Sequence, residues 1–444
     1  MKNIRAFFRP TVLVFTNFIL SALLPSQHIN AQNTWTLQEC IDSALVHNGI
    51  VLSAEATLRS AQSRTAESRS HLLPKINVQG DYRYYNELPV QLMPLSVFNG
   101  PPEQFKTAQF GVPNNISAGI SLNVPLYNGT VLQGINIAEA AEENIKAQNN
   151  KTRETLIYDI TNLYYDAQLL TQRLAVLDSN ITNLEKLSKK TAIAITQKTA
   201  RQTDLSRIEL QILQLKTRRT ELNYSLTQIT SLLRLQMGIK NETPFSVPTL
   251  NFTAGKENYT TRSSAESRIT EARYNFLKQE MTGIRRMYLP AVSLYGYYGT
   301  NGYGFNGTAN DFLNFYPVSF AGIQITYPLF TGFNTRRKYN ARKFETESVR
   351  HQLDYINNAD RIRTENAALQ RESAHNWYVA SQQQLNLAIS IYNQTLLQHS
   401  EGTASMSDVL LADNSLRDAR LNLIDAQIRI LKADLELKKI SGNL

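Results

Sequence analysis

The chain contains the same pattern twice, and this repeat limits its possible folds more than any other feature of its 444 residues. Three short motifs occur in the same order in each half, and the two members of a pair lie 216, 203 and 204 residues apart. The pairs are Leu-Leu-Pro at 72–74 with Tyr-Leu-Pro at 288–290, Val-Pro-Leu-Tyr-Asn-Gly at 124–129 with Tyr-Pro-Leu-Phe-Thr-Gly at 327–332, and Thr-Asp-Leu at 203–205 with Ser-Asp-Val at 407–409. The first offset exceeds the second by 13 residues, so a loop is longer in the first half. A repeat of three motifs in the same order indicates one structural unit present twice.

Each half contains two segments with the alternation of a β-strand, in which every second side chain shares a face. In the first segment Ile76, Val78 and Tyr82 alternate with Asn77 and Gln79, so one face is apolar and the other is polar. The segments at 116–124, 292–298 and 321–327 alternate in a similar way. We therefore expect four strands in two hairpins. The stretches at 88–115 and 302–314 contain the glycine, proline and asparagine that are typical of loops.

The rest of the sequence has apolar residues three and four positions apart, which is the spacing of helices with a continuous packing seam. The clearest seam comprises Leu163, Ala167, Leu170, Leu174, Leu177, Ile181 and Leu184. We expect two helices of about 100 Å at 130–198 and 334–399, because an α-helix rises about 1.5 Å per residue. Four helices of about 50 Å should occupy 36–70, 203–237, 256–287 and 405–440. Two shorter helices laid end to end would match one long helix.

One chain alone can neither close a barrel with its strands nor bury the apolar seams of its long helices. Four strands cannot close a membrane barrel, which needs at least ~8 strands and has no open edge. The long helices likewise cannot bury their seams in a compact globule of this length, so they should pack side by side into a wall that includes other copies. Both arguments predict an oligomer.

The first 31 residues have the features of a secretory signal. Lys2, Arg5 and Arg9 supply the basic start, residues 11–24 are apolar and almost uncharged, and Ala31 stands at a small-residue cleavage position. No later segment has the ~18 consecutive apolar residues of a membrane-spanning helix, so any part within a membrane should consist of strands. The predicted organisation is a signal peptide at 1–31, a first repeat at 32–238, a linker at 239–255 and a second repeat at 256–444.

Composition excludes several classes of function. Cys40 is the single cysteine, which excludes internal disulfides and multi-cysteine zinc sites. The six histidines show no metal-ligand spacing, and the sequence has no phosphate-binding glycine loop and no nucleophile elbow. Without the signal, 43 basic and 37 acidic residues leave a net charge of +6, which gives no support for nucleic-acid binding. We expect a protein that is not an enzyme and that uses no metal and no cofactor.

The residues resemble a known family, the TolC-type outer-membrane efflux proteins. The resemblance covers the whole chain after residue 31. It rests on Leu-Gln-Glu-Cys-Ile-Asp-Ser-Ala-Leu at 37–45, the Leu-Pro before each first strand, the Pro-Leu-(Tyr/Phe)-(Asn/Thr)-Gly after each second strand, and the segment 402–410. It implies an α+β membrane protein with two internal repeats. Three chains would form one 12-stranded outer-membrane β-barrel with four strands per chain, continued by a long periplasmic α-helical coiled-coil barrel.

The resemblance also implies a function: the outer-membrane channel of a tripartite export system. Such a homotrimer would sit in the lipid of the cell outer membrane and extend into the periplasm. It would passively conduct small molecules, such as drugs and toxic compounds, from an inner-membrane pump and a periplasmic adaptor protein to the exterior. Two alternatives remain open. An outer-membrane conduit for type I protein secretion would share this architecture, whereas a periplasmic coiled-coil scaffold would never enter the membrane, and the four alternating strands argue against it.

A wide barrel needs polar side chains toward its lumen and apolar side chains toward lipid. The lumen-facing candidates are the polar members of the alternating strands: Asn77, Gln79, Ser121, Asn123, Gln324 and Thr326. Four tyrosines are suited to the interfacial girdles of a barrel, or are ordinary strand aromatics: Tyr82, Tyr84, Tyr298 and Tyr327.

The turns between long and short helices should lie at the periplasmic tip, farthest from the barrel. The resemblance implies that Gly402 and Thr403 contact the adaptor there. Lys198 stands where the first turn would have its glycine. His399 and Ala404 occupy positions at which many relatives carry residues that latch the closed tip.

Two acids follow these turns. The resemblance implies that Asp408 and Asp204 help to constrict the pore. Each acid also follows a hydroxyl residue at an expected helix start, in Ser407-Asp408 and Thr203-Asp204, so helix capping is the alternative reading.

Overall fold

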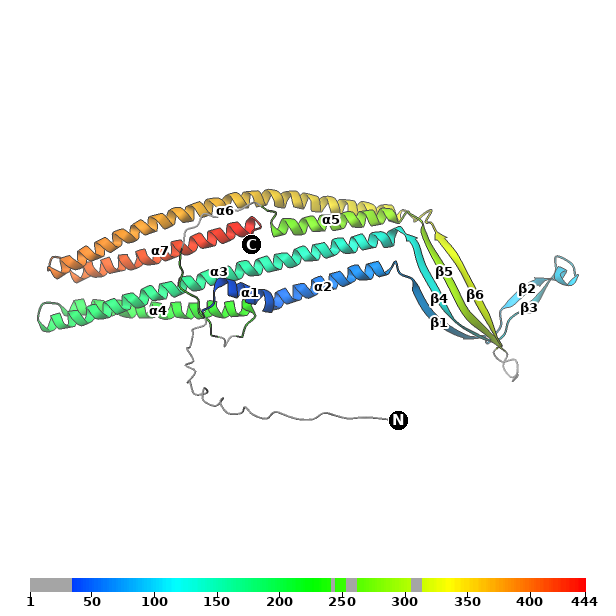
Figure 1. The fold of residues 1–444 in the computed structure, drawn as a ribbon, viewed down its shortest axis with the longest axis horizontal. Helices are drawn as coiled ribbons and strands as arrows, with labels where there is room; N and C mark the ends of the chain where they lie inside the picture. Colours follow the sequence, from blue (N-terminus) through cyan, green and yellow to red (C-terminus); the bar gives the residue numbers. More distant parts are fainter. Residues whose placement is uncertain (1–33, 241–243, 253–261, 305–313) are drawn as a thin grey trace, which may run out of the picture.

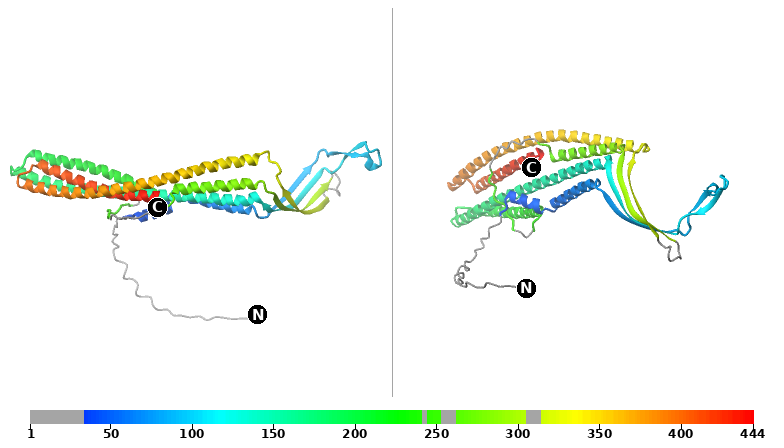
Figure 2. Two further views of the ribbon diagram at one scale, coloured as in Figure 1. Left: turned by 90° about the horizontal axis from the view of Figure 1, so that it is seen from above. Right: turned by 45° about the vertical axis from the view of Figure 1, so that its right-hand side comes forward.

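A computed structural model describes residues 34–240, 244–252, 262–304 and 314–444. The predicted signal peptide at 1–31 lies outside these residues, as does part of the predicted linker. Long helices run side by side, and a sheet continues from one end of them (Figure 1). Seen from above, the molecule is narrow, so the helices and strands form a wall instead of a globule (Figure 2).

The main sheet contains the four predicted strands. They are β1 (Lys75–Tyr84), β4 (Asn114–Asn128), β5 (Ala291–Gly304) and β6 (Asn314–Thr326). Their order is β1-β4-β5-β6 and every pair is antiparallel, which confirms the two predicted hairpins and joins them through β4 and β5. The register of β4 and β5 shifts between Pro125 and Tyr127, within the repeated motif that ends the strand. Strands β1 and β6 are the two edges of this sheet.

The prediction that 88–115 is only a loop is wrong. A separate hairpin of β2 (Val90–Pro94) and β3 (Phe105–Gln109) projects beyond the sheet, with a 3-10 turn, η1 (Leu95–Phe98), between its strands (Figure 1). Each strand has only five residues, which is too short for a period of two to stand out among the neighbouring prolines and glycines. The 13 additional residues of the first half are therefore used to extend a hairpin away from the helices.

The two long helices are confirmed almost to the residue, as α3 (Gly129–Thr196) and α6 (Asn334–Ser400). Helix α3 begins where the repeated motif ends, because the Asn128 side chain accepts hydrogen bonds from the backbone of Thr130 (3.0 Å) and Val131 (3.3 Å). At about 1.5 Å per residue each helix is about 100 Å long. Among the described residues, no helix is both long enough and apolar enough to span a membrane.

The shorter helices show two corrections. They are α1 (Leu37–His47), α2 (Gly49–Ser70), α4 (Gln202–Met237), α5 (Ala265–Arg286) and α7 (Met406–Ile440). The predicted helix at 36–70 is broken at Asn48, which has an extended backbone and caps α2 with its side chain. The helix expected from 256 begins at Ala265, because the Ser264 hydroxyl caps its first turn.

The predicted end-to-end arrangement of short helices is confirmed where α4 ends against α1 and α2. The Asn48 amide donates to the backbone carbonyl of Gln236 (2.8 Å), and the Ser43 hydroxyl donates to that of Met237 (3.3 Å). Gly238 ends α4 with φ of 68°, and a side chain there would collide with the backbone of His47. The break at Asn48 therefore lets the chain turn around the end of α4.

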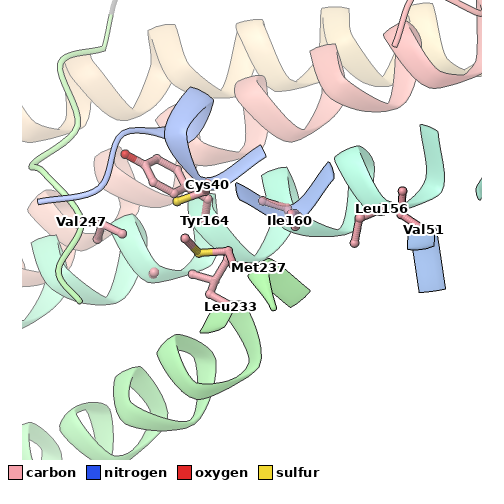
Figure 3. Close-up of a cluster of buried hydrophobic side chains, with 10 residues drawn as sticks. Cys40, Val51, Leu156, Ile160, Tyr164, Leu233, Met237 and Val247 are labelled. Atoms are coloured by element: carbon pink, nitrogen blue, oxygen red, sulfur yellow. The ribbon is translucent and has the colours of Figure 1, made fainter. Parts of the chain in front are cut away.

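A buried apolar cluster holds this junction to α3, as Figure 3 shows. Ile160 and Tyr164 of α3 meet Cys40 of α1 and Met237 of α4. Burial raises the pKa of the Cys40 thiol to about 12, so the single cysteine is a packing residue that stays protonated.

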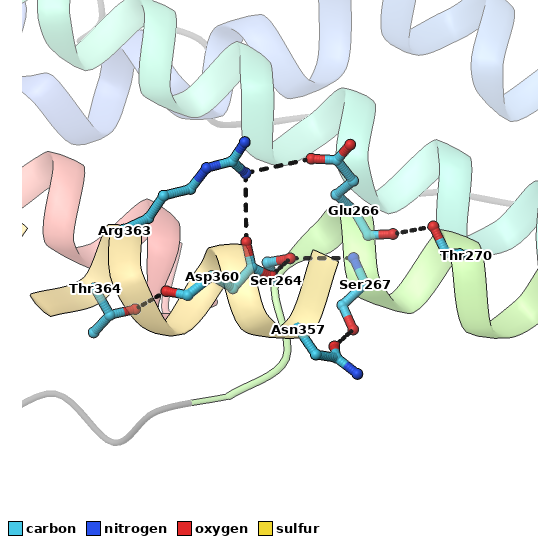
Figure 4. Close-up of polar contacts among 8 residues, drawn as sticks. All are labelled: Ser264, Glu266, Ser267, Thr270, Asn357, Asp360, Arg363 and Thr364. Atoms are coloured by element: carbon cyan, nitrogen blue, oxygen red, sulfur yellow. Dashed lines mark hydrogen bonds and ion pairs between the residues drawn. The ribbon is translucent and has the colours of Figure 1, made fainter. Parts of the chain in front are cut away.

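The second half has a matching junction between the end of α7 and the start of α5. The backbone N–H of Arg262 donates to the carbonyl of Ser441 (2.9 Å). Figure 4 shows how the start of α5 is fixed to α6: the Ser264 hydroxyl donates to Asp360 (2.5 Å), and the Ser267 hydroxyl donates to Asn357 (2.8 Å). The short helices of each half thus meet near the middle of a long helix: α1, α2 and α4 pack on α3, and α5 and α7 pack on α6.

Candidate functional site

The two turns that join long and short helices have the same backbone geometry, 204 residues apart. In the first, Lys198 N–H donates to Ile195 and Thr199 N–H donates to Ala194 (both 2.9 Å). In the second, Gly402 N–H donates to His399 (3.1 Å) and Thr403 N–H donates to Gln398 (2.9 Å). This pair of bonds ends a helix when one residue adopts the left-handed conformation.

Lys198 and Gly402 are the left-handed residues, with φ of 58° and 78°. Lys198 therefore has, in the first turn, the left-handed conformation that Gly402 has in the second turn. The sequence comparison of the two halves predicts this correspondence. A lysine has no particular preference for this conformation, which costs L-residues roughly 1–2 kcal/mol. Gly402 is exposed and has open space where a side chain would begin. The turn at 400–404 is thus an accessible surface at the end of the molecule (Figure 1).

The side chains of the second turn bond to the turn itself. The Thr403 hydroxyl donates to the carbonyl of Gln398 (3.0 Å), and Thr199 repeats this contact with Ala194 in the first turn. Nδ1 of His399 lies 3.0 Å from the carbonyl oxygen of Ala404. His399 and Ala404 therefore contact each other within this chain.

Asp408 belongs to a capping box at the start of α7. Its carboxylate accepts hydrogen bonds from the Ser405 hydroxyl (2.6 Å) and backbone N–H (2.9 Å), while Ser405 Oγ accepts from the backbone of Asp408 (3.3 Å). These two bonds to Ser405 hold the pKa of the Asp408 carboxyl below its ordinary value. The capping reading is correct for Asp408, but the cap residue is Ser405 and the expectation of Ser407 is wrong. The carboxylate is exposed and stays ionised, so capping and a charge at the tip coexist.

Asp204 does not cap its helix. Helix α4 has Arg201 at its N-cap position, with no side-chain hydrogen bond there, so the capping reading of Thr203-Asp204 is wrong. Asp204 does lie in the first turn of α4, where a negative charge is favourable. Asp204 lies one turn from Arg207, whose guanidinium approaches the carboxylate at 3.9 Å and donates to the Ser407 hydroxyl at 2.5 Å. Asp204 therefore has a basic partner that also reaches the start of α7, whereas the Asp408 carboxylate is bonded to Ser405 alone among the described residues.

The two helical hairpins are joined just behind the turns. Seven buried apolar residues from α3, α4 and α7 form one cluster: Ile181, Leu184, Ile208, Leu215, Met406, Val409 and Leu410. Beside it, the amide of Gln211 on α4 donates to the Asn414 side chain on α7 (2.6 Å). These contacts were not predicted. The spacing of apolar residues shows which side of a helix is packed, but it does not show which other helix packs there.

The strand register places all six lumen-facing candidates on one face of the sheet. Directly opposite residues share a face, and Asn77 is opposite Ser121 in β1 and β4. Asn123 lies two positions from Ser121, and Gln79 lies two positions from Asn77. Gln324 and Thr326 of β6 join the same face through their partners in β5, Ser293 and Ala291.

The opposite face is apolar and exposed in the single chain. Its members include Ile76, Val78, Ile120, Tyr298, Ile323 and Ile325. Val78 of the edge strand β1 is 81% exposed and Tyr298 of the inner strand β5 is 70% exposed, which is unusual for large apolar side chains in a sheet. An apolar surface of this extent indicates contact with lipid or with another chain.

Aromatic residues on the polar face were missed by the sequence analysis. Tyr297 continues the row of Asn77 and Ser121, and Phe320 ends that row. Tyr295 lies two positions from Tyr297 and therefore on the same face. Tyr295 and Tyr297 lie on one face of β5 and Tyr298 lies on the other. The pairing of β5 with β4 and β6 was needed to show which of these faces is the polar one.

The described residues contain no group of three or more histidine, cysteine, aspartate or glutamate side chains that could hold a metal ion. The candidate site has two parts, one at each end of the molecule: the helical turns with their acids, and the two-faced sheet.

Comparisons with known proteins agree with this geometry. The family model for outer membrane efflux proteins matches residues 40–238 and 246–443. A search of curated proteins found no match. The outer membrane protein VceC of Vibrio cholerae is similar in structure, with a TM-score of 0.72 and 15% identity over 91% of this chain and 96% of VceC.

Two further solved structures are similar. The CmeC outer membrane channel of Campylobacter jejuni has a TM-score of 0.72 and 12% identity over 92% of this chain and 85% of CmeC. The open state of the MtrE outer membrane channel of Neisseria gonorrhoeae has a TM-score of 0.71 and 17% identity over 91% of this chain and 88% of MtrE. The predicted fold class, a β-barrel with four strands per chain continued by a long helical barrel, is confirmed.

Proposed function

Because the chain belongs to the outer membrane efflux protein family, we propose that it forms the outer-membrane channel of a tripartite export system. The protein lies in the outer membrane, and its helices extend into the periplasm. It conducts small molecules passively to the exterior, in complex with a periplasmic adaptor and through it an inner-membrane pump. Drugs and toxic compounds are the proposed substrates.

The observation that carries this proposal is a four-stranded sheet with one apolar face, whose outer strands β1 and β6 each pair with a single strand among the described residues. In lipid, every backbone N–H and C=O needs a hydrogen-bond partner, so the edges β1 and β6 must pair with strands of other copies. Three copies give twelve strands, enough to close a barrel. The apolar face, with Val78 and Tyr298, contacts lipid in this arrangement, and the polar face with Asn77 and Ser121 lines the lumen.

The helical turns are the proposed docking surface for the adaptor. The exposed turn at Gly402 and Thr403 is the principal contact, and the turn at Lys198 is the corresponding position in the first half. Asp408 and Asp204 form the proposed constriction behind these turns, where three copies of each acid would surround the pore axis.

The proposal is tested first by assembly. The purified protein should be a trimer in mild detergent by native mass spectrometry, and it should fractionate with the outer membrane. A stable, water-soluble monomer would contradict the barrel.

The second test is export of a fluorescent dye by cells that carry Gly402→Trp, which should abolish export while trimer and membrane insertion stay normal. Gly332→Trp is the matched control, because Gly332 also has a left-handed backbone (φ 60°) and open space, but lies at the membrane end of α6. Normal export by the Gly402 variant would place the adaptor contact elsewhere.

A further inference from the structure

Three aromatic rings lie together on the polar face of the sheet. The rings of Tyr297 and Phe320 are stacked, with centroids 5.5 Å apart and an angle of 25° between their planes. The rings of Tyr295 and Phe320 meet edge to face, with centroids 6.1 Å apart and an angle of 67° between their planes. The three residues occupy adjacent positions on β5 and β6, so the sheet holds their spacing.

Glycines beneath these rings bring them down onto the sheet. A Cβ atom at Gly119 would lie 2.5 Å from the Tyr297 hydroxyl oxygen, and one at Gly299 would lie 2.6 Å from the same atom. A Cβ atom at Gly322 would lie 2.7 Å from the Tyr295 hydroxyl oxygen. Each tyrosine therefore extends across the backbone of a neighbouring strand, and a side chain at these glycines would displace it.

The rings nevertheless remain accessible. Phe320 is 53% exposed and Tyr295 is 38% exposed. Their neighbours on this face are polar, since Ser121 is directly opposite Tyr297 and Asn77 is opposite Ser121. A ring that lies along the sheet with polar groups at its side offers an aromatic surface next to hydrogen-bonding groups, which suits a flat molecule with polar substituents better than an acyl chain.

We infer that Tyr295, Tyr297 and Phe320 form a stacking site for planar aromatic small molecules on the wall of the lumen. The inference rests on the proposed function, because it needs the polar face to line the pore. A trimer would have three such sites around its axis. Binding is weak, because one aromatic pair contributes only a small free energy, and a conduit requires sites that release their cargo quickly.

The rings have a second role that a test must separate from binding, because an aromatic ring over a glycine also stabilises a sheet. Tyr295 and Tyr297 cover glycines, whereas Phe320 lies against the two tyrosines and is the most exposed of the three. Phe320 is therefore the residue to change. Tyr298 is the matched control, because it is an exposed aromatic residue next to Tyr297 but on the opposite face.

The experiment records single-channel currents of the full-length trimer in planar bilayers with ethidium as the planar aromatic probe. Ethidium should interrupt the wild-type current, and Phe320→Leu should shorten these interruptions about threefold to tenfold, the effect expected for one lost aromatic contact. Phe320→Trp should preserve the interruptions, and Tyr298→Leu should leave them unchanged. The non-aromatic cation tetrapropylammonium should behave alike in wild type and all variants.

Equal interruptions in wild type and Phe320→Leu would overturn the inference. A channel that conducts but is never interrupted by ethidium would also overturn it, and would leave the proposed function intact. A protein without any conductance would reject both.

Tryptophan fluorescence supplies a second measurement. It uses Phe320→Trp, a variant that retains an aromatic ring at the site. The indole introduced by Phe320→Trp should be quenched by ethidium at concentrations at which the indole introduced by Tyr298→Trp is not. Equal quenching on the two faces would contradict the site.

Discussion

Gln211 of α4 donates a hydrogen bond of 2.6 Å to Asn414 of α7, although the two residues are 203 positions apart in the chain. The bond lies beside the apolar cluster that joins the two helical hairpins near their turns. Nearer the turns, Arg207 donates to the Ser407 hydroxyl across the same pair of helices. The hairpins of the two repeats are therefore tied to each other by polar contacts, and not only by apolar packing.

These contacts should restrict the opening of the tip. Gln211→Ala removes a buried hydrogen bond, whose net contribution is about 1 kcal/mol, and lets α4 and α7 separate more easily. We expect a larger single-channel conductance for this variant in planar bilayers. Gln214→Ala is the control, because Gln214 is exposed on the same helix. Equal conductances of the Gln211 variant and wild type would show that the contact does not limit the opening.

The charge of Asp408 should determine the ion selectivity of the channel. In the proposed trimer, three Asp408 carboxylates at the constriction would favour cations, and Asp408 stays ionised because bonds from Ser405 lower its pKa. Asp408→Asn removes the charge but keeps an acceptor for the Ser405 N–H, whereas Ser405→Ala removes the cap and keeps the charge. We expect the reversal potential in a salt gradient to shift toward lower cation selectivity only in the Asp408 variant.

A different result would show that Asp408 has only a structural role. If Ser405→Ala and Asp408→Asn both lower thermal stability but leave the reversal potential unchanged, the acid is a helix cap and no part of the constriction.

The two tip turns should respond in opposite ways to exchange of their left-handed residues. Lys198→Gly relieves an unfavourable φ and should stabilise the protein by about 1 kcal/mol, reduced in part by the greater freedom of glycine in the unfolded chain. Gly402→Lys should destabilise it by a similar amount. Midpoints of thermal unfolding in detergent measure both effects. A destabilising Lys198→Gly would mean that the lysine side chain makes a contact worth more than the strain of its backbone.

Periodicity predicted the elements well because it depends on local geometry. The alternation around Asn77 fixed one strand and its polar face, and the seam through Leu177 fixed most of α3. Two short patterns in the sequence mark features that the periodicity did not predict. Asn48 is followed by glycine, a pair typical of turns, and it marks the break between α1 and α2. Ser405 precedes Asp408 by three positions, which is the spacing of a capping box.

Other features depend on contacts that no local pattern contains. The bond from Gln211 to Asn414 needs the packing of two repeats, and the position of Tyr297 beside Ser121 needs the register between β4 and β5. The residues of the tip were located through the repeat and the family resemblance, but their bonding partners could be assigned only in three dimensions.

Asp413 should reduce the stability of the protein at neutral pH. It is 6% exposed on α7, and its Oδ2 atom has no hydrogen-bond partner among the described residues. It borders a cavity of about 250 Å³ that is also lined by Lys186 and Lys190 of α3 and by Tyr392 of α6. Burial raises the pKa of the Asp413 carboxyl above its ordinary value of 3.8, although the charges of Arg417 and Arg420 act in the opposite direction.

The sign of the pH dependence follows from the proton balance. With a raised pKa, the folded state binds more protons than the unfolded state, so the contribution of Asp413 to stability falls as the pH rises from about 3.8 through the folded-state pKa. Above the folded-state pKa this loss of stability is complete, and it no longer changes with pH. Asp413→Asn should therefore raise the unfolding temperature at pH 7 and flatten its decline from acidic to neutral pH. Asp418→Asn, at an exposed acid on the same helix, should do neither. Parallel pH profiles of wild type and Asp413→Asn would show that the carboxylate is paired in the proposed trimer.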